Sequence, residues 1–299
     1  MTTAIPAPSL RVLVAGLVDY AGLFPPAGLT MPDAVERYAR YLDSPDAWIL
    51  GRFVVPTARL DELAEVANTL SASAHRPLHL SALVGEDADG DAPRIRAFNA
   101  GHVGRLVVDA AEAKADTPER IADVTRALAG DLDIYLELPY EPDPLPLVAS
   151  VARAGVRAKI RTGGTAREAF PSSAQIARFL VACNRHRVPF KATAGLHHPL
   201  RGDHPLTYLP GAPSATMFGF LNVFVAAALA STGVMEPDLV AALEERHPSA
   251  FAFAEGSLRW RHREIALDHL IRTRSSFALA FGSCSFQEPV DDLRKLALL

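Results

Sequence analysis

The chain carries the run AKIRTGG at residues 158–164 and the run FKATAGLHHP at residues 190–199. Each run begins with apolar or β-branched residues and ends in glycine or proline, which is typical of a buried strand followed by a turn. The segment between them, Ser173–His186, has apolar residues at helical spacing. A strand, a helix and a second strand in this order predict two parallel strands joined by a crossover helix.

The same alternation extends along the rest of the chain. The predicted strands are Leu17–Phe24, Trp48–Val55, Leu78–Val84, Arg105–Asp109, Ile134–Leu138, Ala158–Arg161, Phe190–Ala194 and Phe277–Cys284. The predicted helices are Pro32–Leu42, Thr57–Leu70, Ala92–Ala100, Thr117–Leu128, Leu145–Ala154, Ser173–His186 and Val290–Leu298. Eight strands with interleaved helices predict an α/β fold, a (β/α)₈ TIM barrel that forms one domain over residues 1–299. No G-x-G-x-x-G run follows an early strand, which argues against a dinucleotide-binding fold.

The interval between the seventh and eighth predicted strands is longer than one helix and its loops require. Residues 197–276 are therefore expected to form an insertion over the C-terminal face of the barrel. It contains predicted helices at Met217–Thr232, Pro237–Arg246 and Glu264–Thr273, and a predicted β-hairpin in residues 250–262. Such an insertion can serve as a lid, as a contact between copies of a homo-oligomer, or as a cover for the barrel rim.

Composition disfavours several classes of partner. A net charge of −4 argues against a nucleic-acid-binding surface. The longest apolar run, residues 217–231, is shorter than the roughly 20 residues that cross a bilayer, so no membrane span is expected. Cys183 and Cys284 give no disulfide framework, and the first residues lack a secretory signal pattern, so a cytoplasmic protein is expected.

Lysine is rare in this chain, and two lysines are placed for chemistry. The 30 basic residues include only Lys114, Lys159, Lys191 and Lys295, so arginine supplies most of the positive charge. Unlike arginine, a lysine can lose its proton and act as an amine nucleophile. Lys159 and Lys191 lie near the C-terminal ends of adjacent strands, where barrels carry their active sites.

Two ammonium groups in close approach repel each other, which lowers the pKa of one and leaves a neutral amine for imine formation. The alternative is that one lysine anchors an anion while the other is buried in a salt bridge with Glu137 or Asp109. Glu137 is also a candidate to carry a proton to or from Lys159.

Three short motifs in the second half of the barrel resemble the class I aldolases, most closely the deoxyribose-phosphate aldolase family. They are Lys159-Ile-Arg-Thr-Gly163, Lys191-Ala-Thr-Ala-Gly195 and Gly282-Ser-Cys-Ser285. The resemblance implies that Lys159 forms the Schiff base, that Lys191 tunes it, and that Asp109 relays protons. It also implies that the Gly282–Ser285 loop holds a phosphate.

The chain departs from that family at several places. Arg161 replaces a small residue, Ala194 stands where the family has glycine, and residues 197–276 have no family equivalent. We therefore expect a different substrate, with Arg161 holding an additional carboxylate or phosphate in a bidentate fork.

The loops after the last three strands can present backbone N–H groups to a small anionic metabolite. The residues expected to bind it there are Thr162, Gly163, Gly195, Gly282, Ser283 and Ser285. Glycine at these positions can equally serve only to form a tight turn.

Three histidines after the seventh strand leave a metal site open as an alternative. His197 and His198 are adjacent, and His204 follows. Neighbouring residues of an extended segment point in opposite directions, so we expect His197 and His198 to act as substrate-binding or acid–base groups, with no metal and no cofactor. Cys284 is expected to be a small core residue.

These observations lead to three hypotheses. The first is an aldolase-like carbon–carbon lyase that acts through a lysine Schiff base. The second is a metal-dependent lyase or hydrolase centred on His197, His198 and His204. The third is a non-catalytic barrel that binds a small anionic metabolite.

Overall fold

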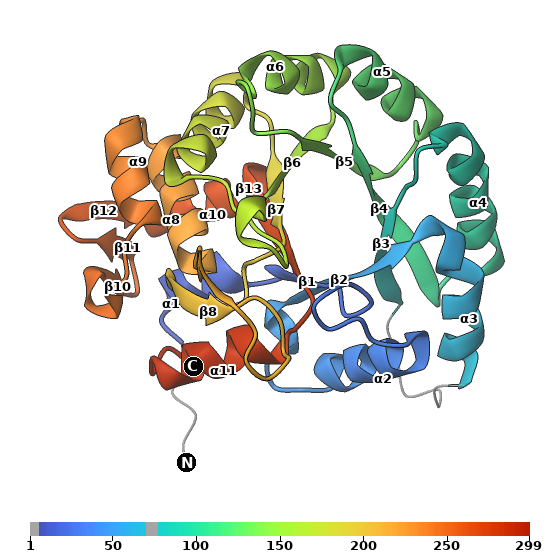
Figure 1. Ribbon diagram of the computed structural model, residues 1–299, viewed down its shortest axis with the longest axis horizontal. Coiled ribbons are helices and arrows are strands. Elements are labelled where there is room, and N and C mark those ends of the chain that lie inside the picture. The colour runs from blue at the N-terminus through green and yellow to red at the C-terminus, as the bar shows by residue number, and fades with distance from the viewer. Residues whose placement is uncertain (1–5, 70–76) are drawn as a thin grey trace.

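Eight parallel strands close into a barrel in the computed structural model, which describes residues 6–69 and 77–299 (Figure 1). Around the barrel their order is β1-β13-β7-β6-β5-β4-β3-β2. They are β1 (Val18–Tyr20), β2 (Leu50–Pro56), β3 (Leu78–Leu83), β4 (Leu106–Lys114), β5 (Asp133–Leu138), β6 (Arg157–Arg161), β7 (Phe190–Thr193) and β13 (Ala278–Ser283). The predicted (β/α)₈ barrel is confirmed.

Helices surround the barrel, and their ends follow local sequence signals. They are α2 (Met31–Leu42), α3 (Leu60–Thr69), α4 (Ala88–Gly101), α5 (Pro118–Ala127), α6 (Leu145–Ala154), α7 (Ser173–His186), α8 (Phe220–Ser231) and α11 (Gln287–Lys295). Thr30 caps α2 by accepting the Asp33 N–H, and Ser172 forms a capping box with Gln175 at the start of α7. Leu70, the last residue of a predicted helix, lies outside the described residues.

Strand β4 is longer than predicted, which changes what it brings to the barrel mouth. It continues past Asp109 through Ala-Ala-Glu-Ala-Lys to Lys114. That run favours a helix by local propensity. Its alanines are nevertheless fully buried in the barrel wall, where tertiary packing outweighs propensity. Asp109 therefore lies in the middle of the strand, and Glu112 and Lys114 lie toward its C-terminal end.

The predicted insertion, residues 197–276, is divided between the barrel wall and the barrel mouth. Helix α8 is buried without interruption from Phe220 to Ala230, and a helix that is apolar all round needs cover on every side. Its Phe224 ring lies 6.4 Å from the ring of Phe190 on β7 and 6.0 Å from that of Phe281 on β13. Helix α8 therefore packs on the outside of the barrel as its seventh helix, rather than over the C-terminal face.

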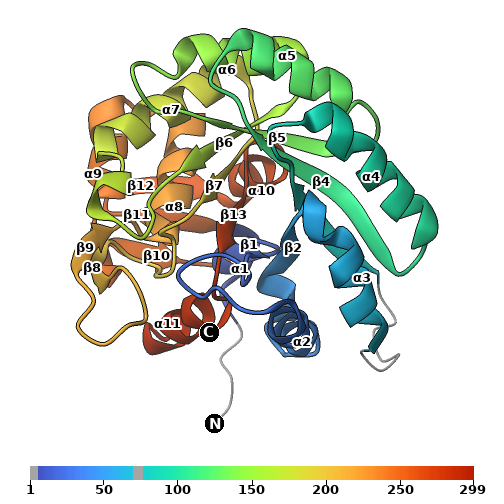
Figure 2. The ribbon, with the colours of Figure 1, turned by 45° about the vertical axis from the view of Figure 1, so that its right-hand side comes forward.

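The remaining insertion elements follow the same division. Helices α9 (Glu236–Leu243) and α10 (Leu267–Ser276) and the sheet β10-β11-β12 lie beside α8, on the outer side (Figures 1 and 2). That sheet joins β10 (Phe251–Phe253), β11 (Ser257–Trp260) and β12 (Arg263–Ala266). The predicted hairpin is thus extended by a third strand, which delays the following helix from Glu264 to Leu267. The hairpin of β8 (Gly202–Pro205) and β9 (Ser214–Met217) belongs instead to the segment that reaches the barrel mouth.

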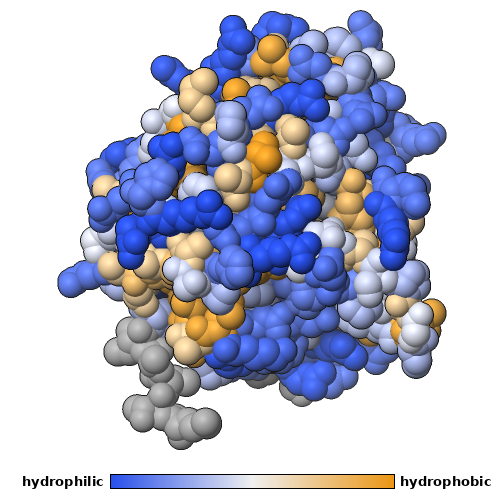
Figure 3. All heavy atoms as spheres, turned by 60° about the vertical axis from the view of Figure 1, so that its left-hand side comes forward, coloured by the Kyte–Doolittle hydropathy of each residue, from blue (hydrophilic) through white to orange (hydrophobic). Residues whose placement is uncertain are grey.

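The face of the molecule in Figure 3 is mostly hydrophilic, with separate apolar areas between the polar side chains. No helix in residues 6–69 and 77–299 is long and apolar enough to cross a membrane.

Candidate active site

A cavity of about 1100 Å³ opens where the barrel strands end. Its wall takes residues from the C-terminal ends of most of the strands, which is where barrel enzymes carry their chemistry. The charged residues of the wall include Glu112, Lys114, Glu137, Lys159, Arg161 and Glu288. The segment after β7 contributes His197, His198, Leu206, Tyr208 and Met217.

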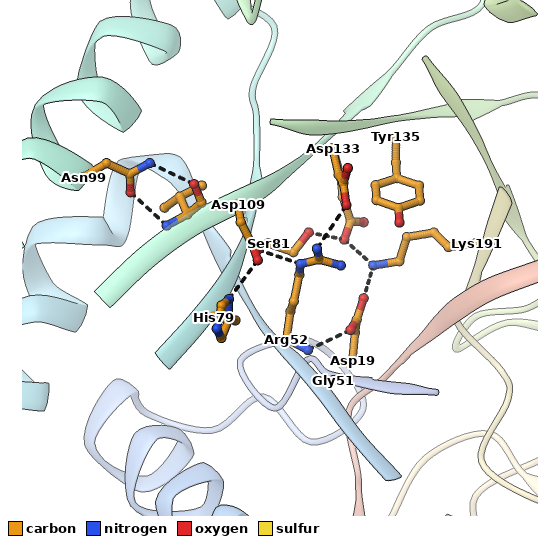
Figure 4. A network of polar contacts seen from close by, with 12 residues as sticks. Asp19, Gly51, Arg52, His79, Ser81, Asn99, Asp109, Asp133, Tyr135 and Lys191 are labelled. Carbon is orange, nitrogen blue, oxygen red and sulfur yellow. Dashed lines mark hydrogen bonds and ion pairs between the residues drawn. The ribbon is translucent and has the colours of Figure 1, made fainter. Parts of the chain in front are cut away.

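Lys159 and Lys191 are brought together as predicted, and a carboxylate lies between them. The two lysines are partners in the pairing of β6 with β7, so their side chains share one face of the sheet. Glu112 bridges them: its Oε2 lies 2.8 Å from Lys159 Nζ, and its Oε1 lies 2.6 Å from Lys191 Nζ. Lys159 Nζ is also 2.8 Å from Glu137 Oε2. Lys191 Nζ is 2.5 Å from Asp19 Oδ2 (Figure 4).

Carboxylates, rather than repulsion between ammonium groups, set the charge of Lys191. Burial alone would lower the pKa of Lys191, but Asp19 and Glu112 outweigh it and hold that pKa above its ordinary value. Burial would likewise raise the pKa of Glu112, and the two lysines hold it well below the usual range. The raised pKa favours the ammonium form of Lys191, and the Glu112 carboxylate lies between this ammonium group and Lys159.

The two lysines differ in whether their amines can be reached from the cavity. Lys191 is 1% exposed and lies below the cavity floor, whereas Lys159 is one of the residues that line the cavity. A substrate in the cavity can reach the amine of Lys159 but not that of Lys191.

Asp109 does not join this group. Its carboxylate is 2.6 Å from Arg52 Nε and 2.8 Å from His79 Nδ1, and Arg52 also lies 3.0 Å from Asp133 (Figure 4). Asp133 begins β5, so this network lies toward the N-terminal ends of the strands, away from the cavity. The prediction that Asp109 lies at the mouth fails because β4 continues past it, and the β4 carboxylate that meets the lysines is Glu112.

Glu137 lies at the cavity wall as predicted and connects Lys159 to Arg161. Its Oε1 accepts a hydrogen bond from Arg161 Nε at 3.2 Å. Burial would raise the pKa of Glu137, but Lys159 and Arg161 lower it. The Arg161 side chain is 42% exposed, so its guanidinium can meet a ligand in the cavity. Lys114, which lies at the end of β4, lines the same cavity and adds positive charge that was not predicted from the sequence.

Only part of the predicted anion-binding loop set reaches the cavity, namely Gly195 and Gly282. Thr162 is buried and donates its hydroxyl to the Ala194 carbonyl at 2.6 Å. A Cβ on Gly163 would lie 2.5 Å from the Phe170 ring, so close packing explains this glycine.

The predicted serines serve the turn between β13 and α11. Ser283 Oγ accepts the Ser285 N–H at 3.3 Å, and Ser285 Oγ accepts the Glu288 N–H at 3.2 Å. For these residues turn formation, rather than anion binding, is what the contacts support.

The adjacent histidines both line the cavity, and each contacts a carboxylate of α11. His197 Nδ1 is 2.9 Å from Glu288 Oε2, and His198 Nδ1 is 2.5 Å from Asp292 Oδ2. His204 stacks on His198 with ring centroids 3.5 Å apart, and burial followed by the charge of His198 lowers its pKa to about 4. In the described part of the chain, no group of three or more His, Cys, Asp or Glu side chains is arranged to hold a metal ion.

Comparison with known proteins gives distant structural matches. No family model matches the chain, and no curated protein matches it. One similar solved structure is a lysine/ornithine decarboxylase from Vibrio vulnificus in complex with cadaverine, with 12% identity and a TM-score of 0.40. The match covers 84% of this chain but only 66% of that enzyme. Another is a dihydropteroate synthase from Xanthomonas albilineans, with 15% identity, a TM-score of 0.40, and coverage of 95% of this chain and 92% of the other.

Proposed function

We propose that this chain is an enzyme in which Lys159 forms an imine with a small anionic carbonyl compound, and that it cleaves or forms a carbon–carbon bond as aldolases do. The observation that carries the proposal is the position of the Lys159 amine. It lies between Glu112 and Glu137 at the wall of a large cavity, while Lys191 holds a fixed positive charge beneath it.

Imine formation requires Lys159 to lose a proton, and Glu137 is placed to take it. Glu137 Oε2 lies 2.8 Å from Lys159 Nζ, within the distance for direct proton transfer. The neutral amine then adds to the carbonyl carbon, and a proton passes from the nitrogen to the oxygen to give a neutral carbinolamine. Glu137 returns its proton to that hydroxyl group, which leaves as water while the nitrogen lone pair forms the C=N bond. The resulting iminium accepts the electron pair of the carbon–carbon bond that breaks.

Glu112 has a different role in this mechanism, because its carboxylate contacts more side chains than that of Glu137. It contacts both lysines, and Ser81 Oγ donates to its Oε1 at 2.7 Å. These contacts favour its ionised form. Glu112 therefore fixes the position of Lys159 and balances the charge of Lys191, rather than carrying the proton.

The chemical class of the substrate follows from the rest of the cavity wall. Lys114 on β4 and Arg161 on β6, the strands on either side of β5, line the cavity, and both favour a carboxylate or phosphate group. Apolar side chains, including Phe24, Leu138 and Met217, form another part of the wall. Such a cavity suits a small compound with one anionic end.

Reductive trapping tests the proposal directly. The protein is incubated with borohydride and a panel of small anionic carbonyl compounds, such as pyruvate, glyoxylate and glyceraldehyde 3-phosphate, then digested and analysed by mass spectrometry. We expect a reduced adduct on the peptide that contains Lys159, and none when either the carbonyl compound or borohydride is omitted. An adduct on Lys191 would reverse the roles of the lysines. Turnover of a compound that leaves no adduct would support a non-imine mechanism, and binding without turnover or adduct would support a non-catalytic barrel.

One observation favours a second candidate, a metal-dependent lyase or hydrolase. His197 and His198 both line the cavity, and a carboxylate that contacts one ring nitrogen is a common support for a metal-binding histidine. If the imine proposal holds, prolonged chelation should leave turnover unchanged, and metal analysis of the purified protein should find no stoichiometric zinc. Loss of turnover on chelation that zinc restores would favour the metal candidate instead.

A further inference from the structure

Cys284 follows the last residue of β13 and lines the same cavity as Lys159. Its Sγ lies 3.9 Å from His197 Nε2, and the other nitrogen of that ring, Nδ1, lies 2.9 Å from Glu288 Oε2. Tyr208 adds a hydroxyl that is 3.7 Å from Sγ and donates to Glu288 Oε2 at 2.7 Å. A thiol, a histidine and an orienting carboxylate in this sequence of contacts form the arrangement that activates nucleophilic cysteines.

The contacts assign the ring nitrogens of His197. A carboxylate accepts hydrogen bonds, so Nδ1 carries a proton and donates it to Glu288, which leaves Nε2 facing the thiol. His197 Nε2 is therefore placed to take the proton of Sγ as the sulfur attacks, while Glu288 fixes the orientation of the ring.

The other cysteine of the chain provides a contrast. Cys183 is fully buried on α7, and burial raises its pKa well above the ordinary value, as expected of an inert core thiol. Cys284 has a histidine, a carboxylate and a tyrosine around it and forms part of a cavity wall. The expectation that Cys284 is only a small core residue does not account for these contacts.

We propose that Cys284, His197 and Glu288 form a second reactive centre of the cavity, in which the Cys284 thiolate adds to a small anionic electrophile. With a carbonyl compound, the Sγ–C bond forms as the C=O π pair moves to oxygen. That oxygen takes the proton from His197 Nε2, and the product is a neutral hemithioacetal with a neutral imidazole. The addition needs no oxidant or further reactant.

Individual cations in the wall that Cys284 shares are the basis for an anionic electrophile. Lys114, Arg120 and Arg161 lie there together with acidic residues that include Glu288, so the preference for a carboxylate rests on contact with one of these cations and not on the net charge of the cavity. This centre does not depend on imine formation by Lys159, and it can be tested without the natural substrate.

Alkylation of the native protein by iodoacetate and by iodoacetamide is the test. We expect both reagents to modify Cys284 and to leave Cys183 unmodified, with peptide mass spectrometry as the readout. The ratio of the iodoacetate rate to the iodoacetamide rate should be several-fold higher at Cys284 than for glutathione in the same buffer. An equal or lower ratio would overturn the preference for anions.

Matched histidine variants test the triad itself. At about pH 6 an ordinary thiol is under about 1% thiolate, so we expect His197→Asn to slow iodoacetamide alkylation of Cys284 about 10-fold. His198→Asn, the same change one residue along, should leave the rate within about twofold. Equal rates in the two variants would overturn the triad.

A measurement on the unaltered histidines keeps the proposal falsifiable if His197→Asn fails to fold. At about pH 6, iodoacetamide should alkylate Cys284 of the wild-type protein about 10-fold faster than it alkylates glutathione. An equal or lower rate would overturn the proposal.

Discussion

Lys159→Arg is expected to reduce turnover by roughly 10³-fold or more and to eliminate the borohydride adduct. Arginine preserves the positive charge beside Glu112 and Glu137, but it stays protonated at any physiological pH and cannot add to a carbonyl carbon. The experiment therefore separates the chemistry of the lysine from its charge. It is measured by steady-state kinetics with a compound that the wild-type protein turns over and by mass spectrometry of the trapped protein.

Lys114→Arg is the matched control for this substitution. Lys114 also lines the cavity, but no part of the proposed imine chemistry rests on it. We expect Lys114→Arg to form the adduct and to retain turnover within a few-fold. Substantial turnover by Lys159→Arg would mean that Lys159 acts through its charge, and Lys159 would no longer be the nucleophile.

Sequence was sufficient to predict the barrel because the signals for it are local. Proline and threonine at the start of α2 and a clear helical period in α7 give these elements their type and most of their bounds. A lysine near the end of each of two consecutive strands then predicts that the two side chains meet, because parallel neighbours place equivalent residues side by side. The register pairs Lys159 with Lys191 and confirms that part of the prediction.

The error at β4 has a physical cause. Ala110, Ala111 and Ala113 are poor strand formers, and the predicted strand ends at Asp109, before the run that contains Glu112. Only the barrel wall, where these small side chains are buried, keeps them extended. The useful signal was the carboxylate itself, since a glutamate in an alanine-rich stretch is a candidate counter-ion for lysines on other strands of the barrel.

The cluster of Cys284, His197 and Glu288 could not be predicted from the sequence, because its contacts join segments that are far apart in the chain. His197 meets Cys284 and Glu288 across 87 and 91 positions. A helical pattern at residues 217–232 likewise predicts a helix but not the side of the barrel on which it packs. Tertiary structure decides both, through the closure of the barrel between β7 and β13.

Lys191→Met should cost about 3–5 kcal/mol of unfolding free energy, the range typical of breaking a buried ion pair from one side. Methionine nearly fills the volume of lysine but leaves Asp19 at 2% exposure without its ammonium partner. Asp19 then keeps only the backbone N–H of Arg52, at 2.8 Å, among the contacts it makes in the described structure. Urea unfolding of the variant and the wild-type protein under the same conditions measures the difference.

Two further variants test why Lys191→Met lowers the free energy of unfolding. Lys114→Met removes an exposed lysine of the cavity wall and should change the unfolding free energy by no more than about 0.5 kcal/mol. Adding Asp19→Asn to Lys191→Met removes the unpaired buried charge, so the double variant should recover part of the lost stability, since residues in direct contact are not additive. If Lys191→Met unfolds at the same urea concentration as Lys114→Met, Lys191 does not carry the buried charge balance that holds Glu112 and Lys159 in position.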